Sequence, residues 1–371
     1  MFRNNIFQSV RFLYKVSHSN KVAHFHFKLY LQMTKPSSPN KITFFSTQAY
    51  DKQFFNGCNE QFGFELNYFE TQLNATTANL VQEGSVVCVF VNDKVDANVV
   101  KQLAAKKVTI IALRCAGFNN VDLEACKQNG IKVCRVPAYS PEAVAEHAVA
   151  MLLTLNRKTH KAYNRVREQN FSLNGLLGFD VHGKTIGVIG TGNIGKAFCK
   201  IMLGFGCKVM AFDIIANKDM EAIGVTYHPL IDIYKAADII SLHCPLTEQT
   251  KHIINTQTIS LLKKGVMLIN TSRGGLIDTN AAIQALKSGH IGYLGIDVYE
   301  QEEKLFFQDL SDTIIEDDTI QRLTSFSNVL VTAHQAFFTN EALTQIATIT
   351  LNSILEFSKG ETLTNKAAML V

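Results

Sequence analysis

The sequence predicts an α/β protein with two doubly wound parallel sheets, each covered by helices on both faces. From Lys41 onward, short apolar runs alternate with amphipathic stretches, and a second series of the same kind begins at Lys184. The chain has 371 residues and 47% hydrophobic content, which is enough for about two domains with cores of their own.

The first alternating series predicts one parallel sheet. Apolar runs at 42–46, 86–91 and 108–114 are expected to be strands, and the amphipathic stretch 97–106 is expected to be a helix. Strands that alternate with helices form parallel sheets, because each crossover helix returns the chain to the same edge.

A long helix is predicted from Pro141 to about Val166. Ser140 is placed to cap it, and proline is favoured as the first helical residue. The nearly continuous apolar run at 141–155 indicates a helix buried on most sides. We therefore expect a homodimer with this helix at the interface.

The second series predicts a six-stranded, doubly wound sheet of the kind that binds nucleotides. Its expected strands are 185–190, 208–213, 239–244, 266–270, 294–297 and 328–334. A final helix around 340–358 is expected to return to the first domain. The predicted division is a leader at 1–40, a first domain at 41–138 completed by 337–371, and a nucleotide-binding domain at 139–336.

Basic residues are distributed unevenly. Residues 1–40 carry six Lys or Arg and no Asp or Glu, which is typical of a mitochondrial transit peptide. The same composition fits an untranslated or disordered leader before Met33, in which case the protein is expected in the cytoplasm. Residues 41–371 keep 30 of the 36 basic residues and all 32 acidic ones, a net charge of about −2, which argues against a nucleic-acid partner.

Other classes of site receive no support. The eight cysteines show no CxxC or metal-ligand spacing, so we expect no metal and reduced, buried thiols in an intracellular protein. No run of about 18 uncharged apolar residues occurs, so no membrane-spanning helix is expected.

A glycine motif predicts a dinucleotide site. Gly190, Gly192 and Gly195 form GxGxxG directly after a predicted strand, and Asp213 ends the next strand 18 residues after Gly195. The glycines permit a tight turn and a close approach of the backbone to a pyrophosphate, while Asp213 accepts hydrogen bonds from a ribose. Ile214 and Ile215 offer no cation to a 2′-phosphate, which favours NAD over NADP.

Two further polar residues follow predicted strands. Arg273 comes after the apolar strand 266–270, where an open α/β sheet binds ligands, and its guanidinium can hold a carboxylate through two hydrogen bonds. His334 follows the strand NVLVTA and is suited to proton transfer near neutral pH. A surface arginine and a structural histidine are the alternatives at these positions.

Seven segments together resemble the D-2-hydroxyacid dehydrogenase family, and most closely its bacterial-type D-lactate dehydrogenases. They are LRCAGFNNVDL (113–123), VPAYSPEAVAEHA (136–148), GVIGTGNIG (187–195), SLHCPLT (241–247), INTSRGGLID (269–278), GIDVYEQE (295–302) and TAHQAF (332–337). The resemblance covers about residues 42–360. It implies two Rossmann-like domains, one for substrate and one for NAD, with an active-site cleft between them.

The resemblance also implies residue roles. Arg273 would bind the 2-keto acid, His334 would be the acid/base, and Glu302, five residues after Asp297, would be the catalytic glutamate that orients it. Glu300 and Glu303 are its near neighbours in sequence. The implied substrate-binding residues are Ala116, Gly117, Tyr139 and Phe337. The implied cofactor-binding residues are Gly190, Gly192, Asn193, Ile194, Gly195, Asp213, Cys244, Pro245, Thr271, Ser272 and Asp297.

The sequence thus predicts an NAD-dependent oxidoreductase that converts pyruvate and NADH to D-lactate and NAD. A reductase of hydroxypyruvate, glyoxylate or another 2-keto acid is the alternative within the same chemistry. An NAD(H)-sensing module that binds partner proteins, in the manner of a co-repressor, is the alternative from another class.

Overall fold

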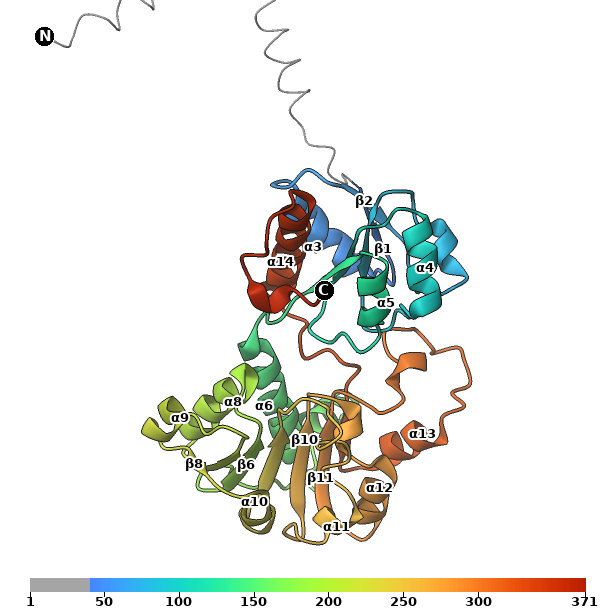
Figure 1. Cartoon of the computed structure of the whole chain (residues 1–371). Coiled ribbons are helices and arrows are strands. Elements are labelled where there is room, and N and C mark those ends of the chain that lie inside the picture. The colour runs from blue at the N-terminus through green and yellow to red at the C-terminus, as the bar shows by residue number, and fades with distance from the viewer. Residues whose placement is uncertain (1–40) are drawn as a thin grey trace, which may run out of the picture. The chain divides into compact units, whose positions relative to one another are not determined.

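The computed structural model describes residues 41–371, so the leader predicted at 1–40 lies outside the described part of the chain. The described residues form two compact units (Figure 1). Unit 1 contains residues up to Pro137 together with Thr348–Val371, and unit 2 is Ala138–Ala347. The chain passes from unit 2 back to unit 1 within α14 (Asn340–Ser358), the helix predicted at 340–358.

Unit 1 is built on a five-stranded parallel sheet with the order β2-β1-β3-β4-β5. This is one of the two common doubly wound orders. Its strands are β1 (Lys41–Phe44), β2 (Glu65–Tyr68), β3 (Val86–Val89), β4 (Ile110–Leu113) and β5 (Lys132–Arg135), and its helices before α14 are α3 (Ala49–Asn59), α4 (Ala97–Ala105) and α5 (Leu123–Gln128). A short 3₁₀ helix, η1 (Thr77–Leu80), precedes β3, and η4 (Lys366–Ala368) follows α14.

Unit 2 is built on a seven-stranded parallel sheet with the order β12-β11-β10-β9-β6-β7-β8. Counted within the unit, this is the Rossmann order extended by one strand. Its strands are β6 (Thr185–Ile189), β7 (Lys208–Phe212), β8 (Thr226–Tyr227), β9 (Ile239–Leu242), β10 (Val266–Asn270), β11 (Ile291–Ile296) and β12 (Val329–Val331). The prediction of two parallel-sheet α/β domains is confirmed.

The helices of unit 2 lie between these strands in sequence. They are α6 (Pro141–Arg157), α7 (Thr159–Arg167), α8 (Asn193–Gly204), α9 (Lys218–Ala222), α10 (Leu230–Ala236), α11 (Thr256–Ile259), α12 (Thr279–Lys287) and α13 (Asp318–Ser325), with 3₁₀ turns η2 (Gly274–Leu276) and η3 (Glu302–Lys304). No helix among residues 41–371 is long and apolar enough to cross a membrane.

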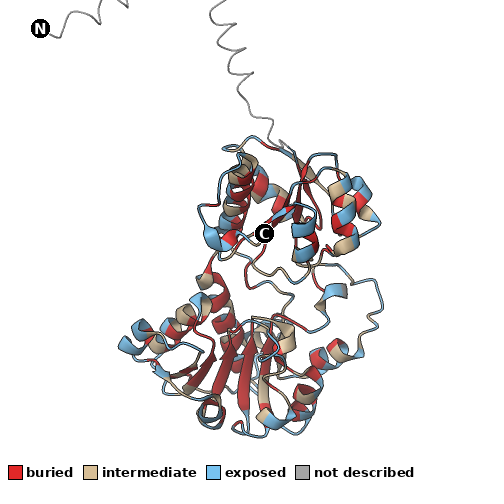
Figure 2. Cartoon of the chain, viewed as in Figure 1, coloured by how far each residue is buried: buried red, intermediate tan, exposed pale blue. Residues whose placement is uncertain are grey.

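Alternating side chains of the central strands supply two cores, one on each face of the unit 2 sheet. In β10, Leu268 joins the core formed with α10, α12 and α13, whereas Met267 and Ile269 join the core formed with α6 and α8. Figure 2 shows central strands such as β10 buried along their length. The sheet is covered on both faces, so its central strands are nearly continuous apolar runs.

The missed strands are all at sheet edges. β2 and β5 are the two edges of the first sheet, and the two-residue β8 is one edge of the second. Edge strands have a neighbour on one side only, and here they include exposed polar residues such as Glu65 and Lys132. Their sequences therefore lack the apolar run that marks a central strand.

The helix predicted from Pro141 to Val166 is two helices. Ser140 caps α6, since its hydroxyl accepts a hydrogen bond from the Ala143 amide, and Pro141 is the first helical residue, as predicted. Lys158 then adopts a left-handed conformation (φ 50°), which ends α6 before α7 begins. Nine of the seventeen residues of α6 are buried within unit 2, so its own unit accounts for much of its apolar character.

Candidate active site

The glycine motif forms a tight turn between β6 and α8. Gly190 has φ 96°, a conformation that side chains disfavour, and a Cβ there would lie 2.6 Å from the His243 carbonyl carbon. A Cβ at Gly195 would lie 2.0 Å from the Gly190 carbonyl oxygen. By contrast, nothing lies within 4 Å of a Cβ added at Gly192. Gly190 and Gly195 therefore permit packing, and Gly192 leaves the turn open to an approaching group.

The start of α8 offers hydrogen-bond donors. Gly192 is the N-cap of the helix, and no side chain caps it. The first-turn amides, which include those of Asn193 and Ile194, have no partner within a helix, and the helix dipole places positive potential there. The turn and the helix start together suit a phosphate-bearing ligand.

Asp213 is fixed beside this turn. Its Oδ2 accepts hydrogen bonds from the amide (2.6 Å) and hydroxyl (2.9 Å) of Thr191, and its Oδ1 accepts one from the Ile214 amide (2.7 Å). A carboxylate has about four acceptor positions, so one remains for a ligand hydroxyl. Ile214 and Ile215 are 93% and 79% exposed and provide no positive charge.

The segments after β9 and β10 lie beside each other. The Ser272 hydroxyl donates to the Cys244 carbonyl at 2.7 Å, which joins them. Burial raises the pKa of the Cys244 thiol to about 11, so the thiol is neutral at pH 7. Pro245 is exposed, and the buried Thr271 hydroxyl oxygen has no hydrogen-bond partner among residues 41–371. An unpaired buried hydroxyl is costly and is suited to meeting a ligand.

Arg273 lies three residues beyond β10, at the N-terminus of η2. The Asn270 side chain shapes this turn. Its Nδ2 donates to the Arg273 carbonyl (2.9 Å), and its Oδ1 accepts from the Ser272 amide (3.1 Å). The guanidinium is half-buried and donates to the Ser272 carbonyl at 2.6 Å. No carboxylate of the described residues forms an ion pair with it. Its charge is thus available to an anion.

His334 and Glu302 form a hydrogen-bonded pair. The Nδ1 atom of His334 lies 2.8 Å from Oε1 of Glu302, and their side chains are 20% and 22% exposed. Glu302 is itself held, since its Oε2 accepts from the Tyr299 amide at 2.9 Å. His334 lies three residues after β12 in a left-handed conformation (φ 51°), with its amide bonded to the Asp297 carbonyl (2.7 Å). This arrangement leaves Nε2 for a substrate.

Asp297 follows β11 and is fully buried. Its carboxylate accepts hydrogen bonds from the Thr332 hydroxyl and from the amides of Gln335 and Ala336, and His147 Nε2 lies 3.4 Å away. Burial alone would raise the pKa of Asp297, but the hydrogen bonds from His147, Thr332 and the two amides outweigh burial and hold it below the usual value. As an ionised group, Asp297 therefore fixes the Thr332 side chain before His334 and the Gln335 and Ala336 backbone after it.

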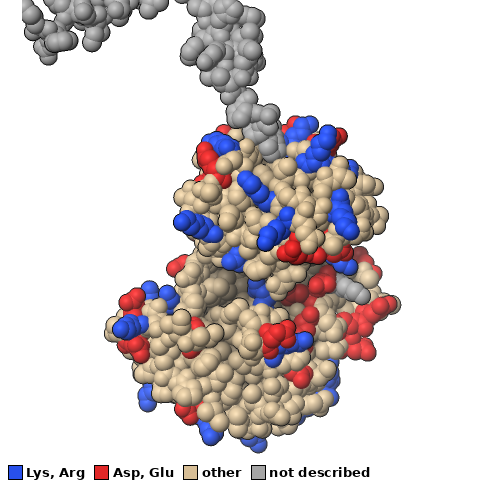
Figure 3. All heavy atoms as spheres, in the orientation of Figure 1, with Lys and Arg blue, Asp and Glu red and all other residues tan. Residues whose placement is uncertain are grey.

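Glu300 and Glu303 differ from Glu302 in their surroundings. Glu300 is paired with His252, whereas Glu303 is exposed and makes no ion pair among the described residues. Figure 3 shows acidic side chains gathered over the loop that leads from η3 to α13, which contains Asp309, Asp312 and Glu316. Of the three neighbouring glutamates, only Glu302 contacts His334.

Tyr139 and Phe337 lie together in unit 2. Their ring centroids are 6.5 Å apart in an edge-to-face arrangement, and Phe337 is buried whereas Tyr139 is half-buried. The structure thus brings together two residues that lie far apart in sequence, each next to a predicted site segment.

Ala116 and Gly117 follow β4 in unit 1. The turn is anchored by hydrogen bonds from Arg135 to the Ala116 carbonyl (2.8 Å) and from the Cys115 thiol to the Gly117 carbonyl (3.3 Å). Within residues 41–371, neither amide donates a hydrogen bond to another protein group. Both amides are thus available to an acceptor such as a carboxylate.

Comparison with known proteins shows the family of the chain. Residues 149–336 match the NAD binding domain of the D-isomer specific 2-hydroxyacid dehydrogenases. The 2-hydroxyacid dehydrogenase homolog 1 of Schizosaccharomyces pombe is 54% identical over 86% of this chain and 96% of its own length. The D-lactate dehydrogenase of Escherichia coli is 51% identical over 88% of this chain and 99% of its own. The solved apo-structure of the D-lactate dehydrogenase from Escherichia coli has a TM-score of 0.82 over 89% of this chain and 100% of that one, at 49% identity.

The chain belongs to the D-isomer specific 2-hydroxyacid dehydrogenase family. The resemblance predicted from the sequence is confirmed, and so is the prediction of an NAD-dependent oxidoreductase. Unit 2 of this dehydrogenase contains the residues that match the family's NAD binding domain.

The residues of unit 2 fit NAD. The open turn at Gly192 and the uncapped start of α8 suit the pyrophosphate, and the remaining acceptor position of Asp213 suits a ribose hydroxyl. The unpaired Thr271 hydroxyl lies after β10, at the carboxyl edge of the sheet, where doubly wound domains bind ligands.

Three polar residues of the dehydrogenase site had no predicted role. His147, Thr332 and Asn270 hold the groups around Asp297 and Arg273 through their side chains. The sequence offered a weak signal for His147, an ionisable residue that directly follows Glu146 in the largely apolar helix predicted at 141–155. The side chains of Thr332 and Asn270 act on groups brought near by the fold, and their spacing in the sequence carries no such signal.

Proposed function

We propose that this dehydrogenase reduces pyruvate to D-lactate with NADH. The hydrogen-bonded pair of His334 and Glu302, in the unit that matches an NAD binding domain, is the observation that supports this chemistry most directly. The choice of pyruvate follows from the 51% identity to the D-lactate dehydrogenase of Escherichia coli over nearly all of both chains.

Arg273 is proposed to bind the keto acid. A guanidinium presents parallel donors that match a carboxylate, and this one has no competing carboxylate among residues 41–371. The Asn270 side chain hydrogen-bonds the Arg273 carbonyl, so the guanidinium extends from a fixed turn. Ala116 and Gly117, whose amides are unpaired among residues 41–371, are proposed as further substrate-binding residues, and Tyr139 and Phe337 are proposed to contact the substrate's methyl group.

His334 is proposed as the acid/base through Nε2. When bound, NADH supplies the hydride that adds to the carbonyl carbon of the substrate. His334 gives its proton to the carbonyl oxygen during reduction and takes the proton back from the hydroxyl during oxidation. Glu302 holds the imidazole at Nδ1, while Asp297 fixes the surrounding backbone.

Substrate assays with the purified full chain test this function. We expect loss of NADH absorbance with pyruvate, with D-lactate as the product, and weaker activity with hydroxypyruvate, glyoxylate and a branched 2-keto acid. A preference for one of the other keto acids would retain the mechanism and overturn the substrate. Binding of NADH without turnover of any of them, together with NADH-dependent capture of a protein partner, would indicate a sensing role.

We further propose that two copies form a homodimer through an apolar arm, residues 163–177. Five large apolar side chains of this arm are exposed: Tyr163 (62%), Val166 (50%), Phe171 (73%), Leu173 (82%) and Leu177 (85%). A concentration of exposed apolar side chains in one segment is characteristic of an interface. A pocket of about 230 Å³ lies in the same unit and offers a recess to a partner's side chain. It is lined by Leu153, Phe179, Val181 and Phe205 together with Asn156, Arg157, Asp180 and His182.

The compartment is proposed to depend on residues 1–40. Fusion of this segment to a fluorescent protein distinguishes the two possibilities. Mitochondrial fluorescence would establish a transit peptide, and diffuse cytoplasmic fluorescence would exclude one.

A further inference from the structure

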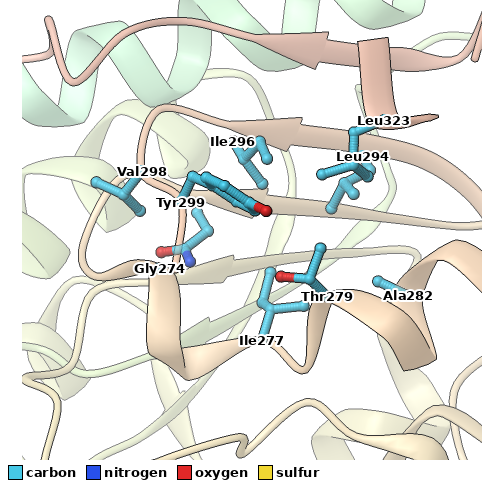
Figure 4. Close-up of a pocket in the computed structure, with 10 residues that line it drawn as sticks. Gly274, Ile277, Thr279, Ala282, Leu294, Ile296, Val298, Tyr299 and Leu323 are labelled. Atoms are coloured by element: carbon cyan, nitrogen blue, oxygen red, sulfur yellow. The ribbon is translucent and has the colours of Figure 1, made fainter. Parts of the chain in front are cut away.

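The loop that carries Glu302 packs directly against the turn that carries Arg273. A Cβ added at Gly274 would lie 2.1 Å from the Tyr299 carbonyl carbon and 2.4 Å from the Glu300 nitrogen. Only a glycine allows two backbones to come this close. Figure 4 shows Gly274 and Tyr299 next to each other in the pocket that they line. The two segments proposed to bind substrate and to orient His334 therefore share one contact surface.

Glu300 joins these segments with both of its carboxylate oxygens. Its Oε1 lies 2.7 Å from His252 Nε2, and its Oε2 accepts from the Thr279 hydroxyl (2.6 Å) and amide (3.2 Å). The His252 amide in turn donates to the Gly275 carbonyl at 2.8 Å, two residues after Arg273. We call this set of Glu300, His252 and Thr279 the Glu300 clasp.

The clasp extends to Glu302 through Tyr299. The Tyr299 amide donates to Glu302 Oε2, and its hydroxyl donates to Asp317, the N-cap of α13. Tyr299 is buried and lines a pocket of only about 10 Å³, so little free space adjoins its ring. The position of Tyr299 therefore determines where the Glu302 carboxylate can lie.

We propose that Glu300 is a positioning residue, whose clasp holds the Glu302 carboxylate against His334 and at a fixed distance from Arg273. This inference rests on the proposed acid/base role of His334. Glu300 makes no contact with His334 and is itself occupied by His252 and Thr279, so it acts through the 299–302 loop. Loss of the clasp loosens this loop and weakens the Glu302–His334 bond.

The test compares Glu300→Gln with Glu303→Gln in the full chain. Both substitutions remove one negative charge from the same loop, but Glu303 is exposed and forms no ion pair within the described residues. We expect Glu300→Gln to lower kcat for pyruvate by about 10- to 100-fold, as a displaced catalytic group does, with the affinity for NADH unchanged. The midpoint of the pH profile for reduction should move to lower pH, because protonated His334 loses a closely held anion. Glu303→Gln should match the wild type in both respects.

A double variant separates a positioning role from a general loss of stability. If Glu300 acts through Glu302, then Glu300→Gln should shift the pH midpoint in the wild type but not further in Glu302→Gln. Additive shifts, or a lower kcat with an unmoved midpoint, would overturn the proposal. If Glu300→Gln does not fold, His252→Ala is the alternative variant, because it removes one of the two partners of the Glu300 carboxylate. The His252 side chain is 36% exposed, and the same outcomes apply.

Titration of the His334 imidazole by NMR makes the result independent of turnover. If the titration midpoint of His334 moves in Glu300→Gln and not in Glu303→Gln, the positioning role of Glu300 is supported even if pyruvate is not the substrate. An unmoved midpoint overturns it. Absence of turnover in the wild type would instead overturn the proposed function.

Discussion

His334 Nδ1 lies 2.8 Å from Glu302 Oε1, although 32 positions separate the two residues in sequence. The backbone of His334 is fixed by the hydrogen bond from its amide to the Asp297 carbonyl. The Glu302 carboxylate is fixed by the hydrogen bond that it accepts from the Tyr299 amide. The imidazole is therefore fixed in orientation, with Nδ1 occupied and Nε2 available.

Substitution of Glu302 tests this pairing. In Glu302→Gln, a protonated His334 has no anion beside it. We therefore expect the midpoint of the kcat–pH profile for pyruvate reduction to move to lower pH. D-lactate oxidation, which needs the neutral imidazole, should extend to lower pH for the same reason. The measurement is kcat against pH in both directions. Unchanged midpoints would show that Glu302 does not influence the proton that His334 transfers.

Arg273 should be needed for the keto acid and not for the cofactor. Replacement by Gln removes charged hydrogen bonds worth about 1.5–3 kcal/mol each, so kcat/KM for pyruvate should fall on the order of 10²- to 10³-fold or more. Arg273→Lys keeps the charge but loses the paired geometry and should recover only part of the activity. Titration of both variants with NADH should give wild-type affinity. Equal turnover in all three proteins would remove Arg273 from the mechanism.

Two glycines should respond differently to the same added methyl group. Gly192→Ala meets no atom within 4 Å, so the melting temperature should be unchanged while the NADH affinity falls, because the methyl group lies in the open turn. Gly195→Ala places a Cβ 2.0 Å from the Gly190 oxygen and should lower the melting temperature as well. Calorimetry and NADH titration on both variants check this. Wild-type NADH affinity in Gly192→Ala would place the pyrophosphate elsewhere.

His243 should make the protein less stable in mild acid. Its ring packs 4.9 Å from the Phe198 ring, its Nε2 lies 2.8 Å from the Ser241 hydroxyl, and burial lowers its pKa from 6.5 to about 3. Between these values the unfolded chain binds a proton that the folded chain does not. The free energy of unfolding is therefore reduced as pH falls below about 6.5, by up to roughly 1.4 kcal/mol per pH unit from this residue.

The control for this prediction is an exposed histidine. His243→Gln should flatten the dependence of the free energy of unfolding on pH between about 6 and 4.5, whereas His182→Gln should leave it as in the wild type. Denaturant unfolding at a series of pH values measures both. Parallel curves for His243→Gln and wild type would contradict the assignment of a neutral imidazole in the folded protein.

The apolar arm should control the oligomeric state. Leu173 and Leu177 are 82% and 85% exposed, so Leu173→Glu with Leu177→Glu should not disturb the core but should place charges in an apolar interface. Sedimentation at micromolar concentration should show a dimer for the wild type and a monomer for the double variant. Ile314→Glu, at an apolar residue 89% exposed outside the arm, is the matched control. A wild-type monomer would exclude the interface.

What the sequence predicted depended on where each element lies. Central strands such as β10, buried on both faces, are apolar along their length and were predicted within a few residues. Edge strands such as β5 were missed because their pattern is mixed, and the break at Lys158 carries neither glycine nor proline to mark it. Catalytic candidates could be placed by family motifs, but the partners that hold them, such as His147 and Thr332, are neighbours only in the fold.

Unit 1 is not contiguous in the chain, and this affects the order in which the protein can form during synthesis. Strand β5 pairs with residues near the end of the sequence: the Leu370 amide donates to the Val133 carbonyl at 2.9 Å, and Arg135 reaches Ala367 across 232 positions. All strands of unit 2 are synthesised before residues 367–371, whereas the β5 edge of unit 1 is paired only after those residues have been made. Deletion of residues 367–371 would therefore leave the β5 edge of the unit 1 sheet without this pairing.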